Sequence, residues 1–197
     1  MPENAPPIRA ENRSLTPAEA TILHDELKTT PNILGYSAHE LLHFGEGLVA
    51  VTDDDTEAFA GVCLCKDLLW NWSDIAVLYV LPAYWGARLA AQLFDAAFVV
   101  LETRKRHVYV LSRTPTVIRW MRERGMTVSE SPIAAPLAAH LDALLHMMNR
   151  YRWREAGRKM PQRRADGHRF LIGTKRHRPK EVYYTSVKSQ MRNRDCK

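Results

Sequence analysis

Residues 74–101 read DIAVLYVLPAYWGARLAAQLFDAAFVVL, and two different periodicities meet within this stretch. Its first eight residues are almost uniformly apolar, which predicts a strand that is buried on both faces and central in its sheet. Pro82 ends this strand because proline has no backbone N–H to donate to a neighbouring strand. After Gly86 the apolar residues recur at helical spacing, with Leu89, Leu93 and Leu101 on one face. The stretch therefore predicts a central strand, a turn and a long helix.

Further elements are predicted on either side of this unit. Residues 48–51 and 58–64 have the pattern of a hairpin around an acidic turn, and residues 107–112 that of another strand. A helix is expected over residues 114–124, and a strand begins at residues 126–128. A further helix is expected to begin at Thr16. Two more helices are expected, over residues 37–44 and over residues 137–154. Strands and helices thus alternate, which indicates an α/β fold.

The chain has 197 residues, 46% hydrophobic and 25% charged, which suits one globular domain with extensions. We expect a flexible leader over residues 1–14, an α/β domain over residues 15–156 and a basic extension over residues 157–197. The longest uncharged apolar run, residues 75–85, is too short to span a bilayer, so no membrane association is expected. The three cysteines lack a disulfide pattern, which favours a cytoplasmic location.

Residues 74–126 resemble the GNAT acyltransferases, which transfer an acyl group from coenzyme A to an amine. The resemblance is carried by element order and by the motif residues Val80–Leu81–Pro82, Tyr84, Trp85 to Ala90, Leu93, Trp120–Met121 and Gly125–Met126. It implies a mixed, mostly antiparallel sheet with helices on both faces, to which the hairpin of residues 48–64 contributes the second and third strands. It also implies that acetyl-CoA is the acyl donor and that an amine attacks it directly, without a covalent enzyme intermediate.

The resemblance places coenzyme A at the turn between the central strand and the long helix. A helix N-terminus that follows a strand directly offers free N–H groups and a partial positive charge to a pyrophosphate. The sequence departs from the family pattern at four positions. Trp85 replaces Arg or Gln, and Arg88 replaces a glycine. Met121 replaces a tyrosine that often protonates the leaving thiolate, and Thr114 replaces an asparagine that often begins the helix of residues 114–124. The expected cofactor-binding residues are Val80, Leu81, Pro82, Trp85, Gly86, Ala87, Arg88, Leu89 and Ala90.

Asp74 is the candidate general base, because it lies at the start of the central strand and a carboxylate can take a proton from an attacking ammonium. The alternative role for Asp74 is a solvated strand cap. Tyr79 and Tyr109 could replace the missing thiolate acid, although strand alternation also suits both as packing residues.

His39, Glu40 and His43 match the H-E-x-x-H pattern of zinc proteases. On a helix both imidazoles would lie on one face, with Glu40 placed to activate a metal-bound water. The helix is short, Gly45 ends it, and no third ligand follows at a suitable spacing. A zinc metalloprotease is therefore a remote alternative, and no metal is expected.

The net charge of +6 is divided unevenly along the chain. Residues 150–197 contain 16 Lys or Arg and 4 Asp or Glu, a balance of +12, so the remainder carries −6. A basic extension can bind nucleic acid or an acidic protein surface. The alternative function is thus a non-catalytic GNAT-like subunit of a nucleoprotein or phage particle. Its candidate binding residues are Arg163, Arg164, Lys175, Arg176, Arg178 and Lys180.

Overall fold

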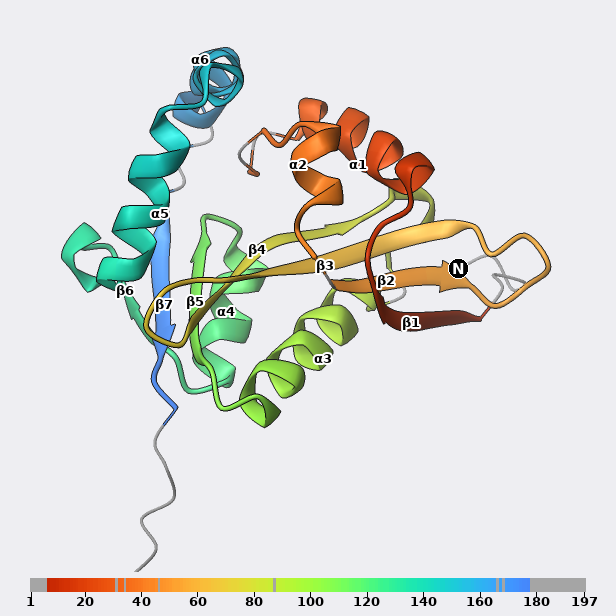
Figure 1. Ribbon diagram of the computed structural model, residues 1–197, viewed down its shortest axis with the longest axis horizontal. Coiled ribbons are helices and arrows are strands. Elements are labelled where there is room, and N and C mark those ends of the chain that lie inside the picture. The colour runs from red at the N-terminus through yellow and green to blue at the C-terminus, as the bar shows by residue number, and fades with distance from the viewer. Residues whose placement is uncertain are drawn as a thin grey trace, which may run out of the picture.

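A single mixed sheet forms the centre of the computed structural model (Figure 1). The structure describes residues 7–177 apart from residues 31, 34, 46, 87, 166 and 168, and only the backbone of residues 147 and 162–165. Within these residues seven strands pair in the order β1-β2-β3-β4-β5-β7-β6. The strands are β1 (Ile8–Arg13), β2 (Gly47–Thr52), β3 (Phe59–Asp67), β4 (Trp72–Val80), β5 (His107–Ser112), β6 (Thr127–Ser129) and β7 (Leu171–Lys175). The helices are α1 (Pro17–Thr29), α2 (Ala38–Leu42), α3 (Leu89–Thr103), α4 (Pro115–Glu123), α5 (Leu137–Met147) and α6 (Arg150–Ala165).

Strand alternation in the first half of the sheet divides the core into two layers. In β2, Val49 and Val51 pack beneath α1 and α2, whereas Leu48 and Ala50 face the opposite layer with α3 and α4. Figure 1 shows these two helix pairs on opposite faces of the sheet. The expected fold, a mostly antiparallel mixed sheet with helices on both faces, is therefore confirmed.

The only parallel pairing among the described strands joins β4 to β5, and it is short. It spans Trp72–His107, Ser73–Val108 and Asp74–Tyr109, and beyond Asp74 the two strands separate. The α3 crossover between β4 and β5 explains why they run parallel. The separation creates a gap in the middle of the sheet.

Two of the expected boundaries are wrong. Residues 1–14 do not form a flexible leader throughout, because Ile8–Arg13 is the edge strand β1 and pairs with β2 along its whole length. Residues 157–197 are not a separate extension, because Leu171–Lys175 is β7 and lies between β5 and β6. The predicted helix of residues 137–154 is two helices, of which α6 continues to Ala165.

The helix α5 covers the second half of the sheet on the face that carries α1 (Figure 1). Ala138 and Ala139 pack there against Trp72, Tyr109 and Ile172, which come from β4, β5 and β7. None of the described helices has the combination of length and hydrophobicity needed to cross a membrane.

Candidate active site

The gap between the separated strands β4 and β5 is a cavity of about 480 Å³. Ala76, Leu78 and Val80 line it from β4, and Leu111 and Ser112 line it from β5. Ala90 and Phe94 of α3 also contribute to its wall. The cavity runs along β4 toward the turn that leads into α3. We call this space the donor groove.

The turn into α3 opens beside the groove onto a second cavity, of about 550 Å³. Trp85 fixes the turn because its indole Nε1 donates a hydrogen bond of 2.8 Å to the Val80 carbonyl. Gly86 has φ +89°, and a Cβ added there would meet no atom within 4 Å. Arg88 is the N-cap of α3 with φ 56°, and no side chain caps the helix. The first residues of α3, Leu89 and Ala90, line the cavity.

This second cavity brings together most of the predicted cofactor-binding residues. Leu81 packs instead against the α1 and α2 layer, Pro82 begins a short 3₁₀ turn, and Ala87 lies outside the described residues. Sequence analysis did not find Arg119, which lines the cavity from α4. The predicted residues that line it are Val80, Trp85, Gly86, Arg88, Leu89 and Ala90.

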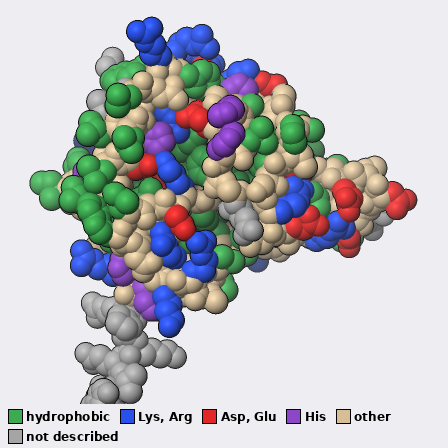
Figure 2. Space-filling model, viewed as in Figure 1, with side chains coloured by type: hydrophobic (Ala, Val, Ile, Leu, Met, Phe, Trp, Pro, Cys, Tyr) green, Lys and Arg blue, Asp and Glu red, His purple; other side chains and the backbone are tan. Residues whose placement is uncertain are grey.

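A third cavity, of about 280 Å³, lies on the face of the sheet that carries α5. Its walls come from β3, β4, β5, α5 and α6, and Figure 2 shows the surface hollowed between α5 and α2. Three residues, Tyr36, Asp74 and Leu111, line both this cavity and the donor groove. The two spaces therefore meet at Asp74, where the pairing of β4 with β5 ends. We call this third cavity the side pocket.

Asp74 has a strongly perturbed carboxyl group. The pKa of Asp74 is raised to about 7, first by burial and then by the nearby Asp142 carboxylate, while Lys66 opposes both effects. None of the described residues donates a hydrogen bond to the Asp74 carboxylate. At neutral pH this group can therefore both accept and release a proton.

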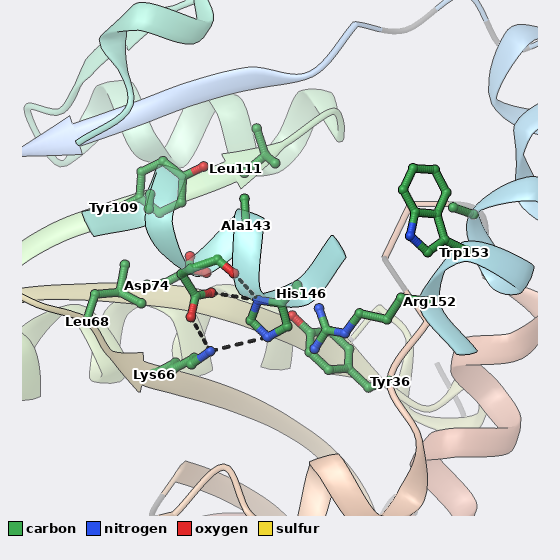
Figure 3. A pocket seen from close by; sticks show the side chains of 13 residues that line it. Tyr36, Lys66, Leu68, Asp74, Tyr109, Leu111, Ala143, His146, Arg152 and Trp153 are labelled. Carbon is green, nitrogen blue, oxygen red and sulfur yellow. Dashed lines mark hydrogen bonds and ion pairs between the residues drawn. The ribbon is translucent and has the colours of Figure 1, made fainter. Parts of the chain in front are cut away.

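Beside Asp74, three charged or titratable side chains bind one another (Figure 3). Lys66 forms an ion pair with Asp142 and donates a hydrogen bond of 3.3 Å to His146 Nε2. Because an ammonium can only donate, His146 Nε2 accepts, and its Nδ1 lies 2.7 Å from the Asp142 carbonyl oxygen and 3.0 Å from Asp142 Oδ2. Burial opposes ionisation of Asp142, but hydrogen bonds from His146 and Lys66 keep its pKa below the usual value.

A second ion pair closes the pocket at the side of α2. Arg152 Nε donates a hydrogen bond of 3.1 Å to Glu40 Oε1, and Asn149 donates one of 3.0 Å to the same oxygen. The Arg152 guanidinium also lies 4.4 Å from the ring centre of Tyr36. Burial and the Asp74 carboxylate raise the pKa of Tyr36 above its usual range, although Arg152 opposes this. Tyr36 is therefore a protonated phenol at neutral pH.

The side chains of the H-E-x-x-H pattern do not form a metal site. His39 and His43 stack on each other with ring centres 4.1 Å apart, and His43 Nδ1 lies 2.7 Å from the His39 carbonyl oxygen. Glu40 turns away from them and completes the capping box of Ser37, with its Oε2 2.8 Å from the Ser37 amide. Within residues 7–177, as described, no three His, Cys, Asp or Glu side chains could hold a metal ion. The zinc protease alternative therefore has no support.

The tyrosines proposed as thiolate acids differ in their surroundings. The Tyr79 hydroxyl donates a hydrogen bond of 2.7 Å to Glu26 of α1, while Tyr109 lines the side pocket near Asp74. Met121, at the position of the family tyrosine, is fully buried. Tyr36 was missed because no local pattern distinguishes it from a packing residue.

The basic candidate residues are only partly described. Lys175 is the last residue of β7, and its Nζ bonds to Glu102 at 2.8 Å and to the Arg124 carbonyl at 2.9 Å, so its charge is engaged within the domain. Arg176 lies beside it, against the cavity that contains His107. The side chains of Arg163 and Arg164, and all of Arg178 and Lys180, lie outside the described residues.

Comparison with solved structures identifies the fold. The N-acetylglutamate synthase of Neisseria gonorrhoeae, complexed with coenzyme A and N-acetyl-glutamate, is similar with a TM-score of 0.55 and 14% identity over 89% of this chain and 36% of that one. Rv2747 from Mycobacterium tuberculosis, in complex with CoA, is similar with a TM-score of 0.56 and 14% identity over 85% and 98%. The ribosomal-protein-S18-alanine N-acetyltransferase of Escherichia coli is similar with a TM-score of 0.52 and 12% identity over 89% and 100%.

The chain spans about a third of the Neisseria enzyme and nearly all of the other two proteins. No protein-family model matches the sequence, and no curated protein matches it. Structural similarity at this level of identity shows the fold, and the fold is that of the GNAT acyltransferases. The predicted resemblance is confirmed in that respect.

Proposed function

We propose that this protein is a CoA-dependent N-acyltransferase that moves an acetyl group from acetyl-CoA to a primary amine. The observation that carries the proposal is the meeting of two cavities at one titratable carboxyl group. The donor groove ends at the open N-terminus of α3, and the side pocket reaches Asp74 from the opposite direction. A two-substrate transfer needs two entrances that meet at a proton acceptor.

The turn into α3 suits a pyrophosphate. The first N–H groups of α3 are not capped by a side chain, and Arg88 and Arg119 line the adjoining cavity. The space beside Gly86 is open, so a phosphate can approach the backbone there. The bound donor supplies a thioester whose carbonyl carbon is open to attack. The Neisseria and Mycobacterium proteins, which share this fold, were crystallised with coenzyme A.

Asp74 acts in this proposal as the general base. An amine enters as its ammonium form, and the carboxylate takes one proton so that the nitrogen lone pair can attack the carbonyl carbon. The new C–N bond forms as the C–S bond breaks, and the thiolate leaves with the electron pair of that bond. Tyr36, which lies between the two cavities, gives its phenolic proton to the thiolate and takes up the second proton that the nitrogen loses as the amide forms. The proton held by Asp74 is then released to water, so the reaction yields the amide, the free thiol and one proton. A base with a pKa near 7 suits this work at neutral pH.

Calorimetric titration with acetyl-CoA tests the donor site. Gly86→Asp places a carboxylate where the phosphate would bind, so we expect affinity to fall by roughly 100-fold or more. Gly125→Asp is the matched control, because Gly125 also has positive φ, +70°, and open space around it, but lies at the end of α4. Absence of wild-type binding at millimolar acetyl-CoA, or equal loss in both variants, would refute the proposed donor site.

The alternative, a non-catalytic subunit that uses basic residues near the C-terminus, remains a separate proposal. It is supported by the charge balance of residues 150–197 and by the position of Arg176 beside His107 and His177. Binding to nucleic acid that weakens steeply with salt, in a protein that has no affinity for acetyl-CoA, would favour this alternative. A cytoplasmic location also stays a proposal, supported by the free thiols of Cys63 and Cys65.

A further inference from the structure

The side pocket contains charged side chains, but its cations are already neutralised. Lys66 is paired with Asp142, and Arg152 is paired with Glu40. The Arg152 side chain is only 10% exposed, because it is enclosed by Glu40 and the ring of Tyr36. Each cation therefore already has an anionic partner, so a ligand carboxylate or phosphate would meet no uncompensated positive charge.

Asp74 is the exception among the charged groups of the pocket. It receives no hydrogen bond from the described residues, and its closest electrostatic neighbours are one carboxylate and one ammonium that bind each other. When Asp74 is ionised, it leaves one negative charge in excess over the two ion pairs. The electrostatics of the pocket therefore favour a ligand that brings a single positive charge to Asp74.

The rest of the wall is apolar. Leu68, Ala139, Ala143 and Trp153 line the pocket, and Figure 3 shows Leu68 and Ala143 beside the charged cluster, with Trp153 farther out toward α6. Hydrocarbon or aromatic groups are the ligand parts that gain most from contact with such a wall. The exposed Trp153 also offers a ring face near the pocket entrance.

The volume limits the size of the ligand. About 280 Å³ is just below the usual range of about 300–1,000 Å³ for small-molecule sites, and one ring with a short amine chain fits this space. From these observations, and resting on the proposed acetyl transfer, we infer that the acceptor is a small primary amine with an apolar or aromatic body and no carboxylate. The pocket thus selects against free amino acids.

Three phenyl compounds test each part of this inference. 2-Phenylethylamine has the ammonium and the ring, phenylalanine adds a carboxylate, and 3-phenylpropionic acid has the carboxylate without the amine. We expect 2-phenylethylamine to be acetylated with a kcat/KM roughly 100-fold or more above that of phenylalanine, because the added carboxylate meets only cations that already have an anionic partner. Binding of 3-phenylpropionic acid should be undetectable. Mass spectrometry measures the product without a thiol reagent, which would also react with cysteine.

A variant separates charge from shape. Asp142→Asn leaves Lys66 without its carboxylate partner, so phenylalanine should gain relative to 2-phenylethylamine by roughly 10-fold or more in the ratio of their kcat/KM values. The ratio cancels any effect on Asp74 that both acceptors share. Glu130→Gln, which changes an exposed acid outside the pocket, is the matched control and should leave the ratio unchanged.

Amine binding is also titrated without any acyl donor, so that the acceptor class is judged independently of transfer. Binding of 2-phenylethylamine that is lost in Asp74→Asn supports the inference, even in a protein that does not bind acetyl-CoA and so fails the proposed function. Acetylation of phenylalanine or glutamate with the same efficiency as 2-phenylethylamine overturns the inference. So does acetylation of a tetrapeptide N-terminus without acetylation of small amines, or coenzyme A binding with no affinity for any amine tested.

Discussion

Replacement of Asp74 by asparagine should make the protein more stable at alkaline pH while it removes the proposed base. The pKa of Asp74 is raised from 3.8 to about 7, mainly by burial and then by the Asp142 carboxylate. The folded protein therefore holds this proton more tightly than the unfolded chain does. When folding raises the pKa of a carboxyl group, the protonated group adds to the unfolding free energy. This contribution is complete below pH 4 and is lost as the pH rises toward 7.

The size of the effect follows from the shift. About three pKa units at 1.36 kcal/mol each give about 4 kcal/mol, which is an upper limit because the pocket is open to water. The asparagine side chain of the variant does not titrate. The unfolding free energy of Asp74→Asn minus that of the wild type should therefore increase between pH 4 and pH 8, by up to about 4 kcal/mol, and stay level above pH 8.

Urea unfolding at half-unit pH intervals measures this difference. Most other groups titrate alike in both proteins and cancel in the subtraction, but Asp142, His146, Lys66, Tyr36 and Tyr109 surround the site and must be tested for coupling. Asp55→Asn, which removes an exposed carboxylate of the β2–β3 turn, is the control. A difference that does not change with pH, or one that falls as pH rises, would show that the Asp74 carboxyl is not destabilised in the folded state.

Three further outcomes follow from the structure. Tyr36→Phe should lower kcat at least 10-fold with little change in acetyl-CoA affinity, whereas Tyr79→Phe, which loses only a hydrogen bond to α1, should cost about 1 kcal/mol of stability and leave kcat near wild type. A chain that ends at Ala156 lacks β7, which pairs with both β5 and β6, and should show no cooperative urea unfolding, and a normal transition would contradict the described topology. His39→Ala and His43→Ala should each retain wild-type acetylation rates, since neither side chain lines the two cavities, and elemental analysis should find no stoichiometric zinc.

The part of the fold that sequence analysis predicted is the part that depends on local pattern. The strand β4 and helix α3 are adjacent in the chain, and their periodicities differ clearly. The strand β7 has five residues, two of them buried, and its partner β5 lies about 60 residues earlier. A strand this short is specified by the neighbours that it meets after folding, so its own sequence carries little signal.

The strand β1 was missed for a different reason. Its alternating charged residues, Arg9, Glu11 and Arg13, resemble a solvated segment when read alone. In the structure they form ion pairs along one half-buried face of an edge strand, where Glu11 binds both arginines. Charged side chains are typical of edge strands, because they hinder pairing with another molecule. Polarity therefore concealed a strand whose other face still contacts the core.

The same separation of local from distant information applies to the site. Asp74 was predicted because it lies at the start of a buried strand. The turn of residues 85–90 was predicted because it joins a strand and a helix whose sequence patterns are both clear. Lys66, Asp142 and Arg152 come from three other segments, and no spacing in the sequence links them. Their pairing can be known only from the folded chain, although it decides which charges the pocket offers to a ligand.

Glu40 shows how a local motif acquires a role from distant contacts. The pattern H-E-x-x-H overlaps with S-x-x-E, and the structure uses the second, since Glu40 accepts from the Ser37 amide and hydroxyl. Its other oxygen accepts from Arg152 of α6, which places the guanidinium over Tyr36. The carboxylate that suggested a metal site therefore joins α2 to α6, neutralises the pocket's second cation and holds the tyrosine between the two cavities. If the acceptor is an amine with an uncharged body, Glu40 contributes to that selectivity without touching the substrate.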